Sequence, residues 1–478
     1  MPLSNRTTIA LSVLATAAAI AAGCVDERIV FRDRELFTEP PTGAADFLGY
    51  TDEEDKLTVC GNCHVEKQSQ WEKTVHASAW EDLQASGHAS EACEACHTVN
   101  TNGNPATGLG GWTATKDTRY HDVQCESCHG AGMTHVENPK SGNVPLAAMV
   151  VDTALTKGCG ECHTGTHHPF VEEWKQSAHA HVQSAAAGRA ECEVCHVGEG
   201  VLQAWGIRTN YLEKDSLLNT PGASMPNVCG VCHDPHQKNF EGQLRFAVDA
   251  KTEELNLCMR CHNRRSNPDP SSSRGPHAPE GPTLLGEAGW FPPNFEYAPG
   301  TIVATHGSDQ NPRLCATCHV GSYQVTDPAT GAFVFQASGH LFEAIPCTNS
   351  QGVPTTGSCA LTQRTFKSCA GTGCHTEVSA RSAYITAEGR IELLSESLDN
   401  LIKKIPLTEF STSDGRYTTG EGAKFNLALA AIPGSKFHNP FLIEALLAAS
   451  IKQIKIDYGI TAPPGLVLDN LLTRPAHN

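Results

Sequence analysis

A five-residue pattern, Cys-x-x-Cys-His, occurs eight times in this chain, and a wider version, Cys-x-x-x-x-Cys-His, follows once. Numbered I to IX in chain order, these motifs are Cys60–His64, Cys93–His97, Cys125–His129, Cys159–His163, Cys192–His196, Cys229–His233, Cys258–His262, Cys315–His319 and Cys369–His375. The spacing places two thiols one helical turn apart, with an imidazole beside the second. This pattern attaches haem c, whose vinyl groups bind the thiols while the histidine ligates the iron. Eight to nine covalent haems are therefore predicted.

The predicted haem-attaching cysteines are Cys60, Cys63, Cys93, Cys96, Cys125, Cys128, Cys159, Cys162, Cys192, Cys195, Cys229, Cys232, Cys258, Cys261, Cys315, Cys318, Cys369 and Cys374. The predicted proximal iron ligands are His64, His97, His129, His163, His196, His233, His262, His319 and His375. A zinc-ribbon array is the alternative for repeated Cys pairs, but it has no need of a histidine directly after every second cysteine. A disulfide framework does not need those histidines either.

Motif IX leaves two interpretations open, because its loop is wider than the others. If Cys369 and Cys374 hold haem, Cys347 and Cys359 remain and are expected to form a disulfide loop. The alternative joins all four of these cysteines in two disulfides.

A sixth ligand decides what each haem can do. Methionine is too scarce to serve most of the irons, since the chain has five, including Met1. Fourteen of the 23 histidines lie outside the motifs, which favours ligation by two histidines. The predicted distal ligands are His76, His88, His121, His135, His168, His179, His236, His277, His306, His340 and His438. Of the neighbours His167 and His168, one is expected to ligate.

Motifs I to V begin 32 to 34 residues apart, which indicates a repeat. Trp71-x-x-x-x-His76-Ala77 recurs as Trp174-x-x-x-x-His179-Ala180, each time between two motifs. We therefore expect a duplicated three-haem module. The predicted division is a signal peptide (1–23), a tether (24–55), two three-haem modules (56–150 and 151–245), a three-haem region (246–376) and a C-terminal helical cover (377–478).

The N-terminal segment contains an apolar run from Ile9 to Gly23, too short to span a membrane and typical of an export signal. It ends in Ala21-Ala22-Gly23-Cys24, which resembles a bacterial lipoprotein box with Cys24 as the lipid-anchored residue; ordinary cleavage is the alternative. We expect an exported outer-membrane lipoprotein facing the periplasm or the cell surface. The formal net charge of −17 argues against nucleic acid and permits a basic redox partner.

The predicted fold is mainly α-helical with extensive loops and little β structure, built around haems. Gly (42) and Pro (28) are frequent, so long regular elements should be scarce before residue 376. After it, apolar residues from Ile391 to Ile405 recur at helical spacing. A second helix should begin at Asn439-Pro440 and stop near Gly459.

The motifs and their surroundings resemble the multihaem c-type cytochromes. The segments Trp71 to Ala77 and Cys125 to His135 are similar to periplasmic decahaem conduits and to the tetrahaem cytochrome of ammonia oxidisers. Cys229 to His236 and Gly339 to Phe342 resemble extracellular multihaem cytochromes, including filament-forming ones, and Phe437 to Pro440 resembles the helical ends of octahaem and pentahaem nitrogen-cycle enzymes. The resemblance implies a chain of low-spin bis-histidine haems, although nine haems match neither four nor ten.

Electron transfer to redox partner proteins or a terminal acceptor is the leading functional prediction. One alternative is a nitrite, hydroxylamine or tetrathionate oxidoreductase with one open haem. No Cys-x-x-Cys-Lys motif marks such a haem, but Tyr384, Tyr417 or Tyr458 could crosslink to one. A filament subunit is the other alternative, in which a neighbouring copy supplies a ligand and the chain self-assembles.

Overall fold

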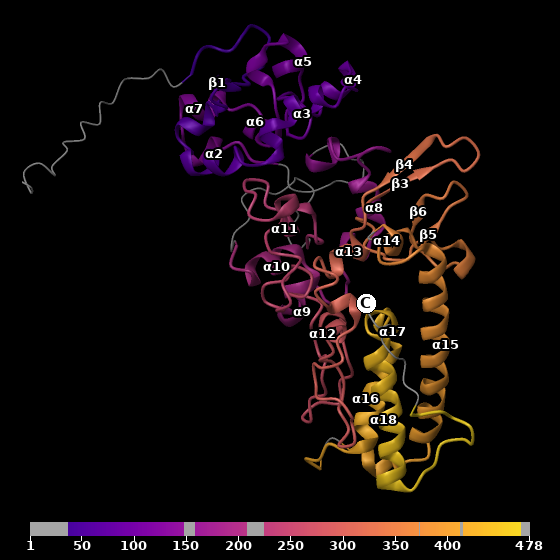
Figure 1. Cartoon of the computed structure of the whole chain (residues 1–478). Helices are drawn as coiled ribbons and strands as arrows, with labels where there is room; N and C mark the ends of the chain where they lie inside the picture. The colour runs from indigo at the N-terminus through magenta and orange to yellow at the C-terminus, as the bar shows by residue number, and fades with distance from the viewer. Residues whose placement is uncertain (1–36, 148–157, 208–223, 372, 412–413, 470–478) are drawn as a thin grey trace, which may run out of the picture. The chain divides into compact units, whose positions relative to one another are not determined.

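The computed structural model describes residues 37–147, 158–207, 224–371, 373–411 and 414–469. The predicted signal peptide and Cys24 lie outside these residues. From Pro40 onward the described chain forms one compact unit. It is mainly helical with many loops and little strand, which confirms the predicted fold class (Figure 1). No helix among the described residues has the length and apolar character needed to cross a bilayer.

The described α-helices before residue 376 are all short. They are α2 (Val65–Trp71), α3 (Ala79–Ala85), α4 (Glu91–Glu94), α5 (Gly111–Thr115), α6 (Cys125–His129), α7 (Met133–Glu137), α8 (Phe170–Gln176), α9 (Ala190–His196), α10 (Gly198–Ala204), α11 (Cys229–Cys232), α12 (Glu280–Leu285), α13 (Cys315–His319) and α14 (Lys367–Ala370). Several of them coincide with the motifs: α6, α9, α11 and α13 contain motif cysteines, as do the single 3₁₀ turns at Cys60–Asn62 and Gly158–Glu161. A helical turn brings the two thiols of a motif to the same side of the chain.

Three small antiparallel sheets of two strands complete the region. They pair β1 (Tyr50–Asp52) with β2 (Leu57–Thr58), β3 (Tyr323–Thr326) with β4 (Phe333–Ala337), and β5 (Cys347–Thr348) with β6 (Pro354–Thr355). Cys347 of β5 is joined to Cys359 by a disulfide, with Cα atoms 6.1 Å apart. The disulfide confirms the loop expected when Cys369 and Cys374 are left for haem, and neither of these two forms a disulfide.

The C-terminal part contains the long helices α15 (Glu377–Ile402), α16 (Thr419–Ala431) and α18 (Pro440–Tyr458), with the short α17 (Ser435–His438) before the last (Figure 1). They pack on one another around a hydrophobic core that includes Leu398 and Leu446. The predicted helix over Ile391–Ile405 lies mostly within α15. The ends of α18 are as predicted: the Asn439 side chain accepts a hydrogen bond from Leu442 N, Pro440 is the first residue, and Gly459 ends the helix at φ 67°.

Helix α16 was not predicted, although the sequence carries a signal for its start. The Thr418 side chain accepts a hydrogen bond from the Glu421 backbone, and the Glu421 side chain accepts one from Thr418 N. This reciprocal capping box is a helix start signal. The core that α16 completes also includes Ala288 and Ile302, so the bundle packs directly on the motif region.

Candidate haem-binding sites

Eight of the nine motif histidines face a histidine from outside the motifs. The facing pairs are His64 with His135 (6.5 Å between ring centres), His163 with His76 (6.2 Å), His129 with His236 (6.3 Å), His262 with His179 (6.3 Å), His196 with His277 (6.0 Å), His233 with His340 (6.3 Å), His375 with His306 (6.3 Å) and His319 with His438 (6.0 Å). No histidine occurs in two of these pairs.

The separation of the rings is that of two imidazoles on opposite sides of one metal ion. An imidazole nitrogen lies about 2 Å from a first-row metal and about 1.1 Å from its own ring centre, so two opposed ligands have centres about 6 Å apart. Each facing pair also has two thiols beside it, and none of the 18 motif cysteines forms a disulfide. Haem c needs two thiols for its vinyl groups and two imidazoles for its iron, because the porphyrin supplies the other four donors to the iron.

The ninth motif histidine, His97, has a looser partner. Burial is the largest cause of the lowered pKa of His168, followed by the charge of its neighbour His167 and then by that of His97. The two rings do not make the contact that the other eight pairs make. His167 stacks instead on Phe333, with ring centres 4.5 Å apart. The structure therefore brings His168, not His167, toward a motif histidine. Of the nine pairs, His97 and His168 of motif II have the least close ring contact.

Of the eleven predicted distal ligands, His88 and His121 face no motif histidine in the described structure. His88 is exposed. The His121 ring is stacked on Trp80, with ring centres 4.1 Å apart, and packs against Trp112. Its Nδ1 lies 2.9 Å from Glu53 Oε1, and its Nε2 is buried without a hydrogen-bond partner.

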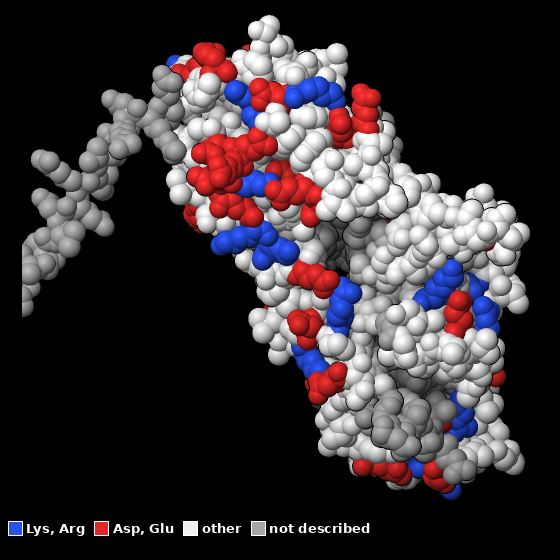
Figure 2. Space-filling view, turned by 45° about the horizontal axis from the view of Figure 1, so that its top comes forward, with Lys and Arg blue, Asp and Glu red and all other residues white. Residues whose placement is uncertain are grey.

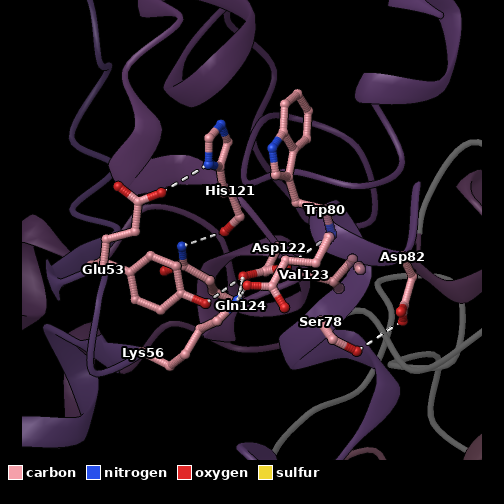
Figure 3. A network of polar contacts seen from close by, with 12 residues as sticks. Glu53, Lys56, Ser78, Trp80, Asp82, His121, Asp122, Val123 and Gln124 are labelled. Carbon is pink, nitrogen blue, oxygen red and sulfur yellow. Dashed lines mark hydrogen bonds and ion pairs between the residues drawn. The ribbon is translucent and has the colours of Figure 1, made fainter. Parts of the chain in front are cut away.

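Figure 3 shows that His121 belongs to a structural network around Asp122. The Asp122 carboxylate accepts hydrogen bonds from Trp80 N (2.9 Å), Tyr50 Oη (2.9 Å) and Lys56 Nζ (2.7 Å). Asp122 is 1% exposed, and a buried carboxylate is stable only with such partners. The network joins β1 and α3 to the segment before motif III.

The protonation state of the facing histidines suits iron ligation. Burial lowers the pKa of His163, His179, His340 and His438 to about 4. These imidazoles are therefore neutral at pH 7, and the neutral form has the free nitrogen lone pair that a metal requires.

Backbone carbonyls orient several of the motif histidines. The Nδ1 atoms of His97, His129, His233 and His319 lie 2.6 to 2.8 Å from the backbone oxygens of Ala79, Pro145, Gly242 and Phe342. Each contact fixes the proton on Nδ1 and leaves Nε2 free for a metal, as outer partners do in metal sites generally.

The Nδ1 of His262 differs, because it lies 3.1 Å from a carboxylate oxygen, Glu280 Oε2. Burial lowers the pKa of His262, but the hydrogen bond and charge of Glu280 outweigh it and raise the pKa overall. A second carboxylate interacts with a distal histidine indirectly, through a serine hydroxyl. Buried Glu173 accepts hydrogen bonds from Ser338 Oγ (2.7 Å) and His340 N (2.7 Å), and Ser338 Oγ lies 3.2 Å from His340 Nδ1. Neither glutamate was predicted, and no motif marks them.

The two segments with the repeated Trp–His pattern make the same contacts. In each, the indole N–H of Trp71 or Trp174 donates to a backbone oxygen two residues before motif III or motif VI, at 2.9 Å. The N–H of that same residue donates to the backbone oxygen of His76 or His179, at 3.1 Å. His76 follows motif I in the chain and faces motif IV, while His179 follows motif IV and faces motif VII. Each of these histidines therefore faces the third motif after the one that it follows.

Thiols of different motifs meet in pairs, which shows which motifs are neighbours. The thiols in contact are Cys60 with Cys125, Cys96 with Cys162, Cys159 with Cys229, Cys195 with Cys261, and Cys258 with Cys315. Longer-range charge interactions add Cys128 with Cys159, Cys232 with Cys258, and Cys318 with Cys369. Motifs I, III, IV, VI, VII, VIII and IX therefore follow one another in space, while motif II adjoins motif IV and motif V adjoins motif VII.

The segment before α18 serves two motifs. The His438 ring faces His319 of motif VIII, while Phe437 O lies 3.2 Å from Nδ1 of His306, the partner of motif IX. Tyr384 of α15 stacks on Phe437, with ring centres 4.1 Å apart. Because α15 and α17 hold these side chains, the C-terminal bundle is part of the site and not only its cover.

Two family models match parts of the chain. The model described as cytochrome c554 and c-prime matches residues 59–130, which contain motifs I to III. The model described as doubled CXXCH motif matches residues 221–267, which contain motifs VI and VII. No curated protein and no solved structure matches the chain.

Proposed function

We propose that this multihaem c-type cytochrome carries electrons through nine covalently attached haems, each with its iron between two histidines. The observation that carries the proposal is the set of eight facing histidine pairs, with ring centres 6.0 to 6.5 Å apart. The ninth haem would be held by motif II, with His168 as its distal ligand. Two histidines on an iron leave no position for a substrate, which favours electron transfer over catalysis.

Bound haem c supplies a reversible one-electron change between ferric and ferrous iron. The chain's own contribution is to space and tune these groups. Motif histidines held at Nδ1 by backbone oxygens keep their orientation, and buried neutral partners close the opposite face. The contacts between motif cysteines bring successive attachment sites together, which supports short steps between neighbouring haems.

The order of the motifs in space supports a branched path. The main path follows motifs I, III, IV, VI, VII, VIII and IX, and motifs II and V lie beside motifs IV and VII. We infer that the second motif of each predicted module is a side branch. Electrons could then enter or leave at more than the two ends.

We also propose that the protein is exported and anchored by a lipid on Cys24, and that it exchanges electrons with a basic redox partner. The apolar run Ile9–Gly23 before Cys24 supports export, and haem c is attached outside the cytoplasm. The charge supports the choice of partner, because the formal net charge is −17 and acidic side chains form a dense group in the upper left of Figure 2, beside smaller groups of Lys and Arg. Opposite charge would speed the encounter at low salt.

One observation favours a second candidate function, an oxidoreductase whose substrate binds at motif II. His97 lacks the close imidazole partner that the other eight motif histidines have. An iron held there would be the one with a face open to a small ligand such as nitrite or hydroxylamine.

Mass spectrometry and electron paramagnetic resonance of the oxidised protein test these proposals together. We expect a mass of the chain plus nine haems and low-spin signals only. His438→Ala should convert one haem of nine to a high-spin form, because His319 loses its partner, while His88→Ala should change nothing. Several high-spin haems in the unmodified protein would contradict the electron-transfer proposal. A single high-spin haem that binds nitrite, and that His438→Ala leaves unchanged, would favour the oxidoreductase.

A further inference from the structure

Among the described residues, Glu280 is the one carboxylate that bonds directly to a motif histidine. Its Oε2 is 3.1 Å from His262 Nδ1. The other motif histidines with an Nδ1 partner use neutral backbone oxygens. Motif VII thus has a negatively charged outer partner where four other motifs have a neutral carbonyl dipole.

The backbone holds Glu280 in this place from both sides. Gly281 N donates to His262 O at 2.9 Å, and Arg264 N donates to Ala278 O at 3.1 Å. Gly281 permits the close approach, because a Cβ atom there would lie 2.9 Å from the Met259 side chain. The packing of α12 on motif VII therefore fixes the backbone from which the Glu280 side chain reaches His262.

Glu280 bonds to the motif at which several other motifs meet. Motif VII adjoins motifs V, VI and VIII, so this carboxylate stands where the proposed path branches.

A carboxylate on Nδ1 increases the electron density that an imidazole gives to its metal. Ferric iron has one positive charge more than ferrous iron, so both this donation and the nearby negative charge favour the ferric state. The effect is larger in a partly buried site than in water, since the effective dielectric constant is lower. A neutral carbonyl partner does the same more weakly.

We propose that Glu280 is a positioning residue that lowers the reduction potential of the haem held by His262 and His179. This haem lies where the proposed electron path branches toward motifs V, VI and VIII, so Glu280 sets the potential at that point. The proposal rests on the proposed electron-transfer function. Glu280 touches neither iron nor substrate; it acts through His262.

The test is a potentiometric titration of the intact haem-loaded protein, followed by visible absorption and electron paramagnetic resonance. Glu280→Gln removes the charge and retains the shape, so one of the nine one-electron components should shift to higher potential, and the components of neighbouring haems should shift less. Glu287→Gln is the matched control, because Glu287 lies just beyond α12 and is exposed. It should move no single component.

A titration in which Glu280→Gln and Glu287→Gln are indistinguishable would overturn the proposal. If Glu280→Gln does not assemble, Glu280→Asp replaces it: the charge stays but the contact lengthens, so a smaller upward shift is expected, and the absence of any shift overturns the proposal. The haem count and the low-spin signals of the unmodified protein are measured first. Their failure would contradict the electron-transfer function, and not the tuning role of Glu280 in particular.

Discussion

The motif region and the C-terminal bundle differ in what fills their interiors. Before residue 376 the longest α-helices of the described chain, such as α2 and α8, have 7 residues, and their buried apolar side chains form small separate clusters. In the bundle, α15 has 26 residues and α18 has 19, and one large cluster joins them. The comparison teaches that the first region lacks a continuous side-chain core, and that haems would have to supply it, whereas the second region has its own.

The largest expected effect follows from withholding the cofactor. We expect a chain produced without covalent haem attachment to lose protection of backbone amides throughout residues 56–376, because small clusters cannot offset the entropy of ordering so many loops. Amides of α15, α16 and α18 should remain the best protected, since their core consists of side chains. Hydrogen exchange with mass spectrometry measures both parts in one sample. Equal protection of the two regions in the haem-free chain would show that the comparison is wrong.

The next effect tests the bundle core with two equal substitutions in one helix. Leu398 of α15 is fully buried, whereas Leu393 is 49% exposed. Leu398→Ala should reduce the free energy of local unfolding of the bundle by about 3 kcal/mol, and Leu393→Ala by less than about 0.5 kcal/mol. Exchange of the α15 and α18 amides in the haem-loaded protein gives both values. Similar losses for the two variants would mean that the bundle has no specific core of its own.

The smallest effect concerns the connection between the two regions. Asn439 caps α18 through Leu442 N (3.0 Å), and its amide donates to Ile302 O (2.8 Å) in the motif region. Asn439→Ala should cost about 1 to 2 kcal/mol. Because His438 precedes it, the haem of motif VIII should also become partly high-spin.

Thr376→Ala is the matched control for Asn439→Ala. It removes the N-cap of α15, whose hydroxyl bonds to Ser379 within the same helix. A similar loss of stability is expected, but no change of spin state at motif VIII. A change of spin state in both variants would show that general loosening of the bundle, and not the bond to Ile302, releases His438.

The sequence was sufficient for features that depend on nearby residues. The motifs, the start of α18 at Asn439-Pro440 and its stop at Gly459 all follow from local chemistry. The sequence could not predict which histidines face each other, because the facing residues are far apart along the chain. His135, for example, lies next to motif III in the chain but faces His64. The surroundings of His121 also could not be predicted, because only the structure shows Trp80 against its ring. Helix α16 was missed because its Gly and Ala residues give a weak apolar pattern.

The exchange of histidines between distant motifs has a consequence for how such a chain can change over generations. The first predicted module, 56–150, contains motifs II and III, but the partners of these motifs, His168 and His236, lie in the second module. A gene encoding the first module alone would leave two irons short of a ligand. Duplication can therefore lengthen this chain only if the new segment also carries a histidine that ligates a haem of the old segment. The segment that is copied is thus not the segment that completes a haem site.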